Sequence, residues 1–371
     1  MTATSISWTG PGGAGPAMYP MRRWVFEDSL GRYDIDLGDS HVKCGTLDQL
    51  TSVGALELNY GVDRGSAPLA ELIAARYGGS AEHVLVTHGS QEALYLLYAT
   101  LLRPGDRVIA FRPGWQQAWD VPERLGGQVE LLDLTEDFDL DLDRLAAAGG
   151  DDLRLITVNT PSNPTGRRLR PHEFDALLAL AERSGAYLVL DEEYVLDLSE
   201  SRALGADRVI SVSSVSKVYG FPGLRVGWMY GPLDVIRECI EYKHFTSISN
   251  SVLCEALAAD VLARQERWAR EYHRLVGGGL SILTGWAASH AEQVRLVPPE
   301  GTPFAWLHLR TAESSLSFVR RVLGHGVLVM PAETFGTVRG LRISFAREPE
   351  QLLDGLRRVS QSFAESEDRA T

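Results

Sequence analysis

One lysine near the middle of the chain lies in a segment suited to covalent chemistry with an aldehyde. Serines precede Lys217, glycines follow it, and Arg225 lies eight residues further along, all within Ser214–Trp228. A lysine amine forms an imine only when it is neutral, and burial beside a cation such as Arg225 favours that form by lowering the pKa of the amine. Arg225 and the Ser214 hydroxyl can also hold a phosphate. A lone S-x-x-K is typical of a surface loop, whereas the whole segment favours an amine held against a phosphorylated aldehyde.

A helix start after a strand-like run provides a candidate anion site. Val84–Thr87 is followed by His88 and then by Gly89, Ser90 and Gln91, where a helical pattern begins. Free backbone N–H groups and the helix dipole favour an anion at such a point. A Gly-Ser pair also caps helices routinely and is weak evidence by itself. The Lys217 segment, which indicates a phosphorylated ligand, supports its interpretation as an anion site. We expect these three residues to bind the phosphate.

Side chains after other strand-like runs could hold an aromatic ring. Trp115 offers a flat surface, and aromatic stacking contributes about 0.5–1.5 kcal/mol beyond burial, although a core or surface role is the alternative. Asp191 could pair with a protonated ring nitrogen or simply cap the next helix. Asn163 lies in Asn159–Gly166, whose Asn-Pro and Pro-Thr-Gly pairs by themselves indicate only a turn.

The runs that carry these motifs alternate with helical patterns such as Gln91–Leu102 and Pro171–Ser184. The strand-like runs are Val84–Thr87, Arg107–Phe111, Gln128–Leu132, Arg154–Val158, Tyr187–Leu190, Arg208–Val212 and Val226–Tyr230. This alternation predicts an α/β fold with a doubly wound, mostly parallel sheet. Ligands of such sheets bind beyond the carboxyl ends of the strands, where the motifs lie.

The pattern changes from about Gln265, where a long charged helix begins. An α+β tail follows, with strand-like Phe304–Leu309 and Gly340–Phe345 around a helix near Glu313–Leu323. We therefore expect a large cofactor domain over residues 41–265 and a smaller α+β domain that combines residues 1–40 with 266–371.

Composition excludes several classes of function. The 371 residues carry 49 acids against 36 bases, a net charge of −13 that disfavours nucleic acid and anionic membranes as partners. The first twenty residues lack the apolar block of a signal peptide, and no apolar run could span a bilayer. A regulator built on this fold would need a basic DNA-binding domain, for which residues 1–40 are too few and too rich in Gly and Pro.

The three cysteines, Cys44, Cys239 and Cys254, are widely spaced and form no C-x-x-C motif. They predict buried, reduced thiols in a cytoplasmic protein. The histidines show no spacing typical of a metal site, so we expect no metal.

Several motifs occur together in one order. Ser214–Trp228, the N-x-P-x-N-P-T-G run at Asn159–Gly166, and Asp191–Tyr194 resemble the fold-type-I pyridoxal-phosphate enzymes of the class I/II aminotransferase family over most of the chain. The resemblance implies a seven-stranded sheet in the large domain, pyridoxal 5′-phosphate as cofactor, an α-amino acid as substrate and a homodimer. Lys217 would form the aldimine with the cofactor and then act as the base on Cα–H, leading to a quinonoid intermediate.

The resemblance also implies roles for single residues. The phosphate ligands would be Gly89, Ser90, Gln91, Ser214, Arg225 and, from the neighbouring subunit, Tyr60. The ring would meet Trp115 by stacking, Asp191 at its nitrogen, and Asn163 and Tyr194 at its phenolic oxygen. The substrate carboxylate would bind Arg342, with Gly38 and Asn163 nearby. The loop after Gly38 lacks the proline often found there and reads Asp39-Ser40-His41, so its substrate contacts stay open.

A narrower resemblance concerns the fate of the substrate. Thr87–Tyr95, Tyr219–Trp228 and His325–Val329 are similar to capreomycidine synthase-like enzymes, which eliminate a β-hydroxyl from a hydroxylated arginine and close a ring with its guanidine. Asp39 and Glu333 are candidate carboxylates for that guanidinium. Both outcomes start from the same intermediate. The expectation is a biosynthetic aminotransferase, with an arginine-derived cyclase as the alternative.

Overall fold

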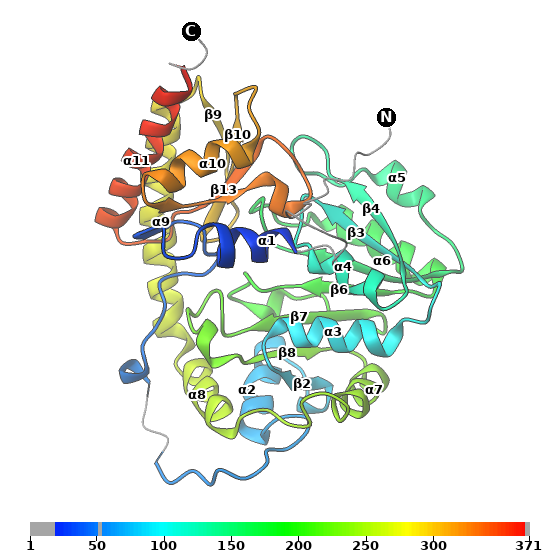
Figure 1. The fold of residues 1–371 in the computed structure, drawn as a ribbon. Coiled ribbons are helices and arrows are strands. Elements are labelled where there is room, and N and C mark those ends of the chain that lie inside the picture. Colours follow the sequence, from blue (N-terminus) through cyan, green and yellow to red (C-terminus); the bar gives the residue numbers. More distant parts are fainter. Residues whose placement is uncertain (1–18, 51–53, 368–371) are drawn as a thin grey trace.

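The computed structural model describes residues 19–50 and 54–367, and its largest element is a seven-stranded sheet (Figure 1). In spatial order the strands are β2 (Val84–Thr87), β8 (Gly227–Tyr230), β7 (Val209–Ser214), β6 (Tyr187–Asp191), β5 (Leu153–Asn159), β3 (Arg107–Arg112) and β4 (Gln128–Asp133). Neighbouring strands are parallel, except that β8 runs antiparallel to β2 and β7. The predicted doubly wound, mostly parallel sheet is confirmed.

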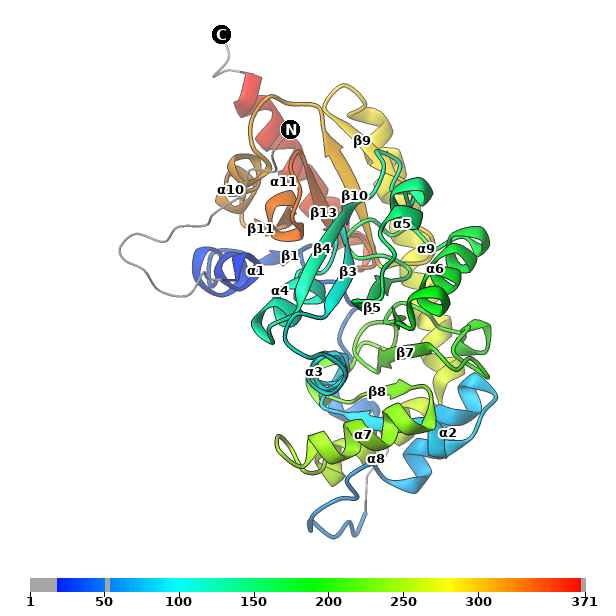
Figure 2. The same ribbon diagram turned by 90° about the vertical axis from the view of Figure 1, so that its right-hand side faces the viewer.

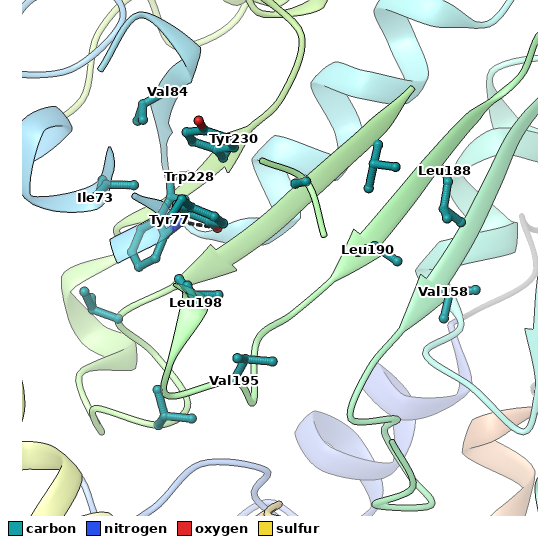
Figure 3. Packing of buried hydrophobic residues seen from close by; sticks show 14 of the residues in the cluster. Ile73, Tyr77, Val84, Val158, Leu188, Leu190, Val195, Leu198, Trp228 and Tyr230 are labelled. Atoms are coloured by element: carbon teal, nitrogen blue, oxygen red, sulfur yellow. Dashed lines mark hydrogen bonds between the residues drawn. The ribbon is translucent and has the colours of Figure 1, made fainter. Parts of the chain in front are cut away.

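Helices cover both faces of this sheet. One face packs against α2 (Ala67–Tyr77), α5 (Leu142–Ala147), α6 (Pro171–Ser184) and α8 (Val252–Ala263), and the other against α3 (Ser90–Leu101), α4 (Gln117–Arg124) and α7 (Leu233–Lys243). Side chains alternate between the faces, as the period of a strand requires: Leu188 and Leu190 join the first layer and Val189 joins the second. In the first layer the Trp228 indole donates a hydrogen bond of 3.0 Å to the Tyr77 hydroxyl (Figure 3).

Helix α6 shows how local sequence sets these elements. Pro171 occupies its first turn, where no backbone donor is needed, and Gly185 ends it with a left-handed φ of 68°. Phe174, Leu177 and Ala181 recur at three- and four-residue spacing and are buried against the sheet. The predicted bounds of this helix are confirmed.

A smaller antiparallel sheet lies beside the large one, in the order β12 (Met330–Pro331), β13 (Gly340–Ser344), β10 (Phe304–Leu309) and β9 (Val294–Val297). A parallel pair joins β1 (Ile35–Asp36) to β11 (Val327–Leu328). The helices here are α1 (Pro20–Arg23), α9 (Gln265–Ser289), α10 (Ser315–Gly324) and α11 (Pro349–Glu367). Figures 1 and 2 show α9 running from the small sheet toward α8.

Short helical turns complete the chain at Trp24–Asp28, Leu47–Gln49, Ala81–His83, Leu198–Glu200, Pro222–Leu224 and Ala332–Phe335. The division of the chain into domains at residue 265 stays a prediction, and residues 1–18 of the expected small domain lie outside the described residues.

All three cysteines are free thiols, and the prediction that all are buried was wrong: only Cys239 is buried, whereas Cys44 is exposed. Within residues 19–50 and 54–367, no helix is both long and apolar enough to cross a membrane.

Candidate active site

A cavity of about 180 Å³ lies at the carboxyl end of the large sheet. Its wall comes from segments that follow β2, β3, β5, β6 and β7 and from the loop after β1. Eight residues expected to bind the cofactor line it together: Ser90, Gln91, Trp115, Asn163, Asp191, Tyr194, Lys217 and Arg225. The topology therefore gathers residues that are up to 135 positions apart, from 90 to 225.

Lys217 lies three residues beyond β7, with its amine enclosed at this cavity. Nζ donates a hydrogen bond to Ser40 Oγ at 3.1 Å. Burial lowers the pKa of the amine and Arg342 acts in the same direction. Arg342, a residue of β13, is therefore a cation that helps to lower the pKa of the amine. A lowered pKa raises the share of neutral, nucleophilic amine at neutral pH.

The other two lysines of the chain face elsewhere. Lys43 is exposed and pairs with Glu348 at 3.5 Å. Lys243 is buried and donates to the backbone oxygens of Asp63 and Val86 at 2.7 and 2.9 Å. Only Lys217 among the three lines the cavity.

Asp191 ends β6 and is buried at the cavity wall. Burial, followed by the negative charge of Glu193, raises the pKa of the Asp191 carboxyl far above its usual range. A cation placed against Asp191, such as a protonated pyridine nitrogen, would reverse this shift. The site is therefore suited to such a partner.

Asn163 and Tyr194 provide two hydrogen-bond donors at the cavity wall. Arg342 Nη1 donates to Asn163 Oδ1 at 2.7 Å, which leaves the amide NH₂ group of Asn163 to donate to a ligand. Burial raises the pKa of the Tyr194 hydroxyl, while Arg342 and a hydrogen bond with Ser40 oppose this, so Tyr194 stays a protonated donor. Trp115 lines the same cavity, and its indole donates to Gln91 Oε1 at 3.3 Å.

The start of α3 and Arg225 form a cradle for an anion. Gly89 has a left-handed φ of 75°, and a Cβ there would lie 2.3 Å from Arg225 Nη2. A Cβ on Gly227 would lie 2.4 Å from the backbone nitrogen of Ser90. These close approaches require glycine, and they bring the guanidinium to the free N–H groups of the first helical turn.

Arg342 is almost fully buried on β13, where its guanidinium carbon lies 5.1 Å from the ring centres of Phe304 and Phe335. Nη2 donates to the backbone oxygen of Gly38, and Nε has no hydrogen-bond partner among the described residues. A substrate carboxylate would satisfy the buried N–H groups that these contacts leave over.

Seven of the residues named from the sequence do not line the cavity: Gly38, Asp39, Tyr60, Gly89, Ser214, Glu333 and Arg342. Ser214 is fully buried and donates to Glu193 Oε2 at 2.8 Å, while Ser216 takes the place at the wall. Tyr60 is 83% exposed, beside an open groove. Glu333 accepts a hydrogen bond from the backbone nitrogen of Leu316 at 3.1 Å, near the start of α10.

Seven other residues at the cavity were not predicted as site residues: Ser40, Leu94, Gln117, Asn159, Glu193, Ser216 and Pro222. Ser40 stands in the loop whose missing proline had marked a departure from the family pattern. Glu193 lies inside the D-E-E-Y run and could have been singled out as an extra carboxylate. Gln117 carried no signal in the sequence.

The cavity fits a phosphorylated pyridine aldehyde in its charges and donors. Its lining includes the Lys217 amine, the Trp115 ring, the buried Asp191 carboxylate, and Ser90 and Arg225 of the anion cradle. In the described part of the chain, no group of three or more His, Cys, Asp or Glu side chains could hold a metal ion.

Comparisons with known proteins agree with this geometry. The family model "Aminotransferase class I and II" matches residues 46–359. The capreomycidine synthase of Streptomyces vinaceus is 31% identical over 96% of this chain and 97% of its own. A PLP-dependent aminotransferase from Streptococcus suis superposes with a TM-score of 0.87 at 26% identity, covering 94% of this chain and 97% of its own. The PLP-dependent cyclase OrfR gives 0.86 at 29% identity, covering 97% and 100%.

Proposed function

The chain belongs to the class I and II aminotransferase family and is a pyridoxal-phosphate-dependent enzyme, and we propose that Lys217 binds the cofactor and removes the α-proton of an amino-acid substrate. The observation that carries this proposal is the position of Lys217 Nζ. It belongs to the only one of three lysines that lines the cavity, and burial lowers the pKa of its amine.

Different residues of the site would bind different parts of the cofactor. Ser90, Gln91 and the Arg225 guanidinium hold the phosphate at the start of α3, with Gly89 giving the backbone room. Asp191 pairs with the ring nitrogen, and Trp115 lies against the ring. Asn163 and Tyr194 donate to the phenolic oxygen. When bound, the cofactor supplies an electron-poor ring that accepts the electron pair of the broken Cα–H bond.

Substrate binding places the α-carbon near Lys217. Arg342 takes the α-carboxylate through charge-assisted hydrogen bonds, close to the Gly38 backbone. The Lys217 amine, once free of the cofactor, would accept the proton from Cα. Ser40, in contact with Nζ, keeps the amine in place during this transfer. In transamination Lys217 would give the proton back, the cofactor would keep the amino group, and water would supply the carbonyl oxygen of the keto acid.

A second candidate function is loss of a β-hydroxyl from a hydroxylated arginine followed by ring closure. The full-length similarity to capreomycidine synthase and to the cyclase OrfR favours it. The Asp39 side chain is 49% exposed, and its carboxylate accepts from His41 Nε2 at 3.0 Å. Partial burial raises the pKa of this carboxyl, but the hydrogen bond and charge of His41 and the charges of Arg347 and Lys217 lower it overall. Asp39 is therefore an anion available to a guanidinium.

A homodimer completes the site in this proposal, with Tyr60 reaching the phosphate of the neighbouring subunit. Support comes from apolar surface near the groove at Leu58–Gly61: Leu58, Tyr60 and Phe245 are 77%, 83% and 86% exposed. Side chains of this kind in one region indicate an interface.

We also place the enzyme in the cytoplasm, since its three cysteines stay unpaired. Titration of the unfolded protein with a thiol reagent should find three thiols in unreduced samples.

One experiment separates the two reactions. Arginine, hydroxylated arginines and common amino acids are added separately to the cofactor-loaded protein, and product mass and cofactor absorbance are followed. Conversion of the cofactor to its amine form, with a keto acid as product, supports transamination. Loss of water from a hydroxylated arginine without that conversion supports the cyclase and rejects plain transamination.

A further inference from the structure

Glu193 is a buried carboxylate at the cavity that the proposed reaction does not yet use. The residue is 4% exposed and lines the cavity together with Lys217. Its Oε2 accepts from the Ser214 hydroxyl at 2.8 Å, while Oε1 has no hydrogen-bond partner among the described residues. A buried carboxylate oxygen without a partner costs free energy unless a nearby cation offsets it.

The preceding residue shows what a purely structural carboxylate looks like here. Glu192 is as buried as Glu193, at 5% exposed, but it does not line this cavity. Its Oε2 accepts from the hydroxyls of Ser201 and Ser211. Two hydroxyls thus hold Oε2 of Glu192, whereas Glu193 has a single hydroxyl donor and a buried Oε1 without a partner among the described residues.

Lys217 is a cation in the same cavity wall as Glu193. The two residues follow β6 and β7, which are adjacent parallel strands, so both project from the same edge of the sheet. Burial lowers the pKa of Lys217, and among the charges around it Glu193 raises the pKa most, ahead of Asp39 and Asp191, while Arg342 lowers it.

We propose that Glu193 is the counter-ion of Lys217 in the state in which the lysine is free of the cofactor. Its carboxylate favours the ammonium form and so helps the amine to keep the proton taken from the substrate. Glu193 acts through Lys217 and is a positioning residue. The inference rests on the proposed function, in which Lys217 carries that proton. The Ser214 hydroxyl, which was expected at the phosphate, donates to Glu193.

Because the chain contains only three lysines, the reactivity of each can be measured separately. Apoprotein is labelled with acetic anhydride across a range of pH, and the acetylation of Lys43, Lys217 and Lys243 is quantified by peptide mass spectrometry. Glu193→Gln should move the midpoint of Lys217 reactivity down by about one pH unit, since a buried negative charge has been removed. Lys43, which is exposed, serves as the internal reference. Glu192→Gln, the matched control, should leave the midpoint of Lys217 where it is.

Two further variants separate charge from structure. Ser214→Ala removes the hydrogen bond of Glu193 but keeps its charge, and should not lower the midpoint. If Glu193→Gln does not fold, Glu193→Asp and Glu193→Ala are compared: only Glu193→Ala should lower it. An unshifted midpoint in Glu193→Gln, an equal shift in Glu192→Gln or Ser214→Ala, or an equal shift in Glu193→Asp would overturn the proposal.

The loaded enzyme gives a second readout. The pH midpoint of the bound cofactor's visible absorbance should fall in Glu193→Gln in the same direction as the labelling midpoint. A wild-type protein with no such absorbance would refute the role of Lys217 itself. Normal absorbance together with an unshifted labelling midpoint in the apoprotein would refute only the role of Glu193.

Discussion

The Lys217 amine donates a hydrogen bond of 3.1 Å to the Ser40 hydroxyl, 177 positions away in the sequence. Two arginines that lie on or just after β13 hold the loop that carries Ser40. Arg342 donates to the backbone oxygen of Gly38, and Arg347 donates to the backbone oxygen of His41 at 2.9 Å. The arginine proposed to bind the substrate carboxylate therefore also holds the loop that contacts the lysine.

Replacement of Ser40 by alanine should slow the reaction while the cofactor stays bound. A single hydrogen bond contributes about 0.5–1.5 kcal/mol, so kcat should fall roughly two- to tenfold. Steady-state kinetics at saturating substrate measure this, with Ser40→Thr as the control that keeps a hydroxyl. A Ser40→Ala enzyme with the kcat of the wild type would show that the contact has no role in the reaction.

Replacement of Arg342 by alanine should weaken substrate binding strongly. Two charge-assisted hydrogen bonds of about 1.5–3 kcal/mol each predict that KM rises by about 10²- to 10⁴-fold. Arg342→Lys should recover only part of this, because it keeps the charge but not the planar fork. An amine substrate without a carboxylate should respond little to either change. Equal losses with both substrates would point to a structural role instead.

The apoprotein should become less stable as the pH rises, owing to Asp191. Its pKa is raised in the folded state, so the folded protein holds a proton that the unfolded chain has lost above about pH 4. The contribution of Asp191 to stability is full below that pH and falls by about 1.4 kcal/mol per unit until the raised pKa is passed.

Asp191→Asn removes this titration. Urea unfolding of both apoproteins should therefore show that the variant gains stability relative to the wild type between pH 5 and about pH 8. A difference that stays constant over this range would mean that Asp191 is already ionised in the apoprotein. The cofactor-loaded wild type should lack the effect, since the ring nitrogen keeps Asp191 charged.

Mixing Lys217→Ala with Tyr60→Phe tests the proposed dimer. Lys217→Ala lacks the base, and Tyr60→Phe lacks the hydroxyl proposed to reach the partner's phosphate, which should weaken cofactor binding about tenfold. A heterodimer would contain one site with both native residues, so activity at limiting cofactor should reappear after mixing. Light scattering establishes the assembly state. A monomer, or mixtures no more active than their components, would contradict the dimeric site.

Much of the fold follows from the sequence because periodicity and turn residues act locally. The strand β2, the strand β10 and the helix α6 have the bounds that their patterns predict. The antiparallel direction of β8 could not be predicted in this way. Val226–Tyr230 has the pattern of any other buried strand, and its direction depends on the path of the chain around it.

Some features of the site could likewise be predicted from the sequence, and others could not. Asn163, Asp191 and Lys217 lie in motifs whose order could be read along the chain, and the structure brings them to one cavity. The contact between Ser40 and Lys217 depends on how the loop after β1 meets β7, which no local pattern encodes. The orientation of Ser214 depends on the charge of its neighbour Glu193, so a motif that names only Ser214 could not foresee it.

The most direct test of Lys217 is to locate the covalent link to the cofactor. The loaded protein is reduced with borohydride, digested and mapped by mass spectrometry. The mass of the reduced cofactor should appear on the peptide that contains Lys217, and Lys217→Ala should carry none. Attachment at Lys43 or Lys243, or an unmodified Lys217 in protein that retains the cofactor's visible absorbance before reduction, would contradict the account.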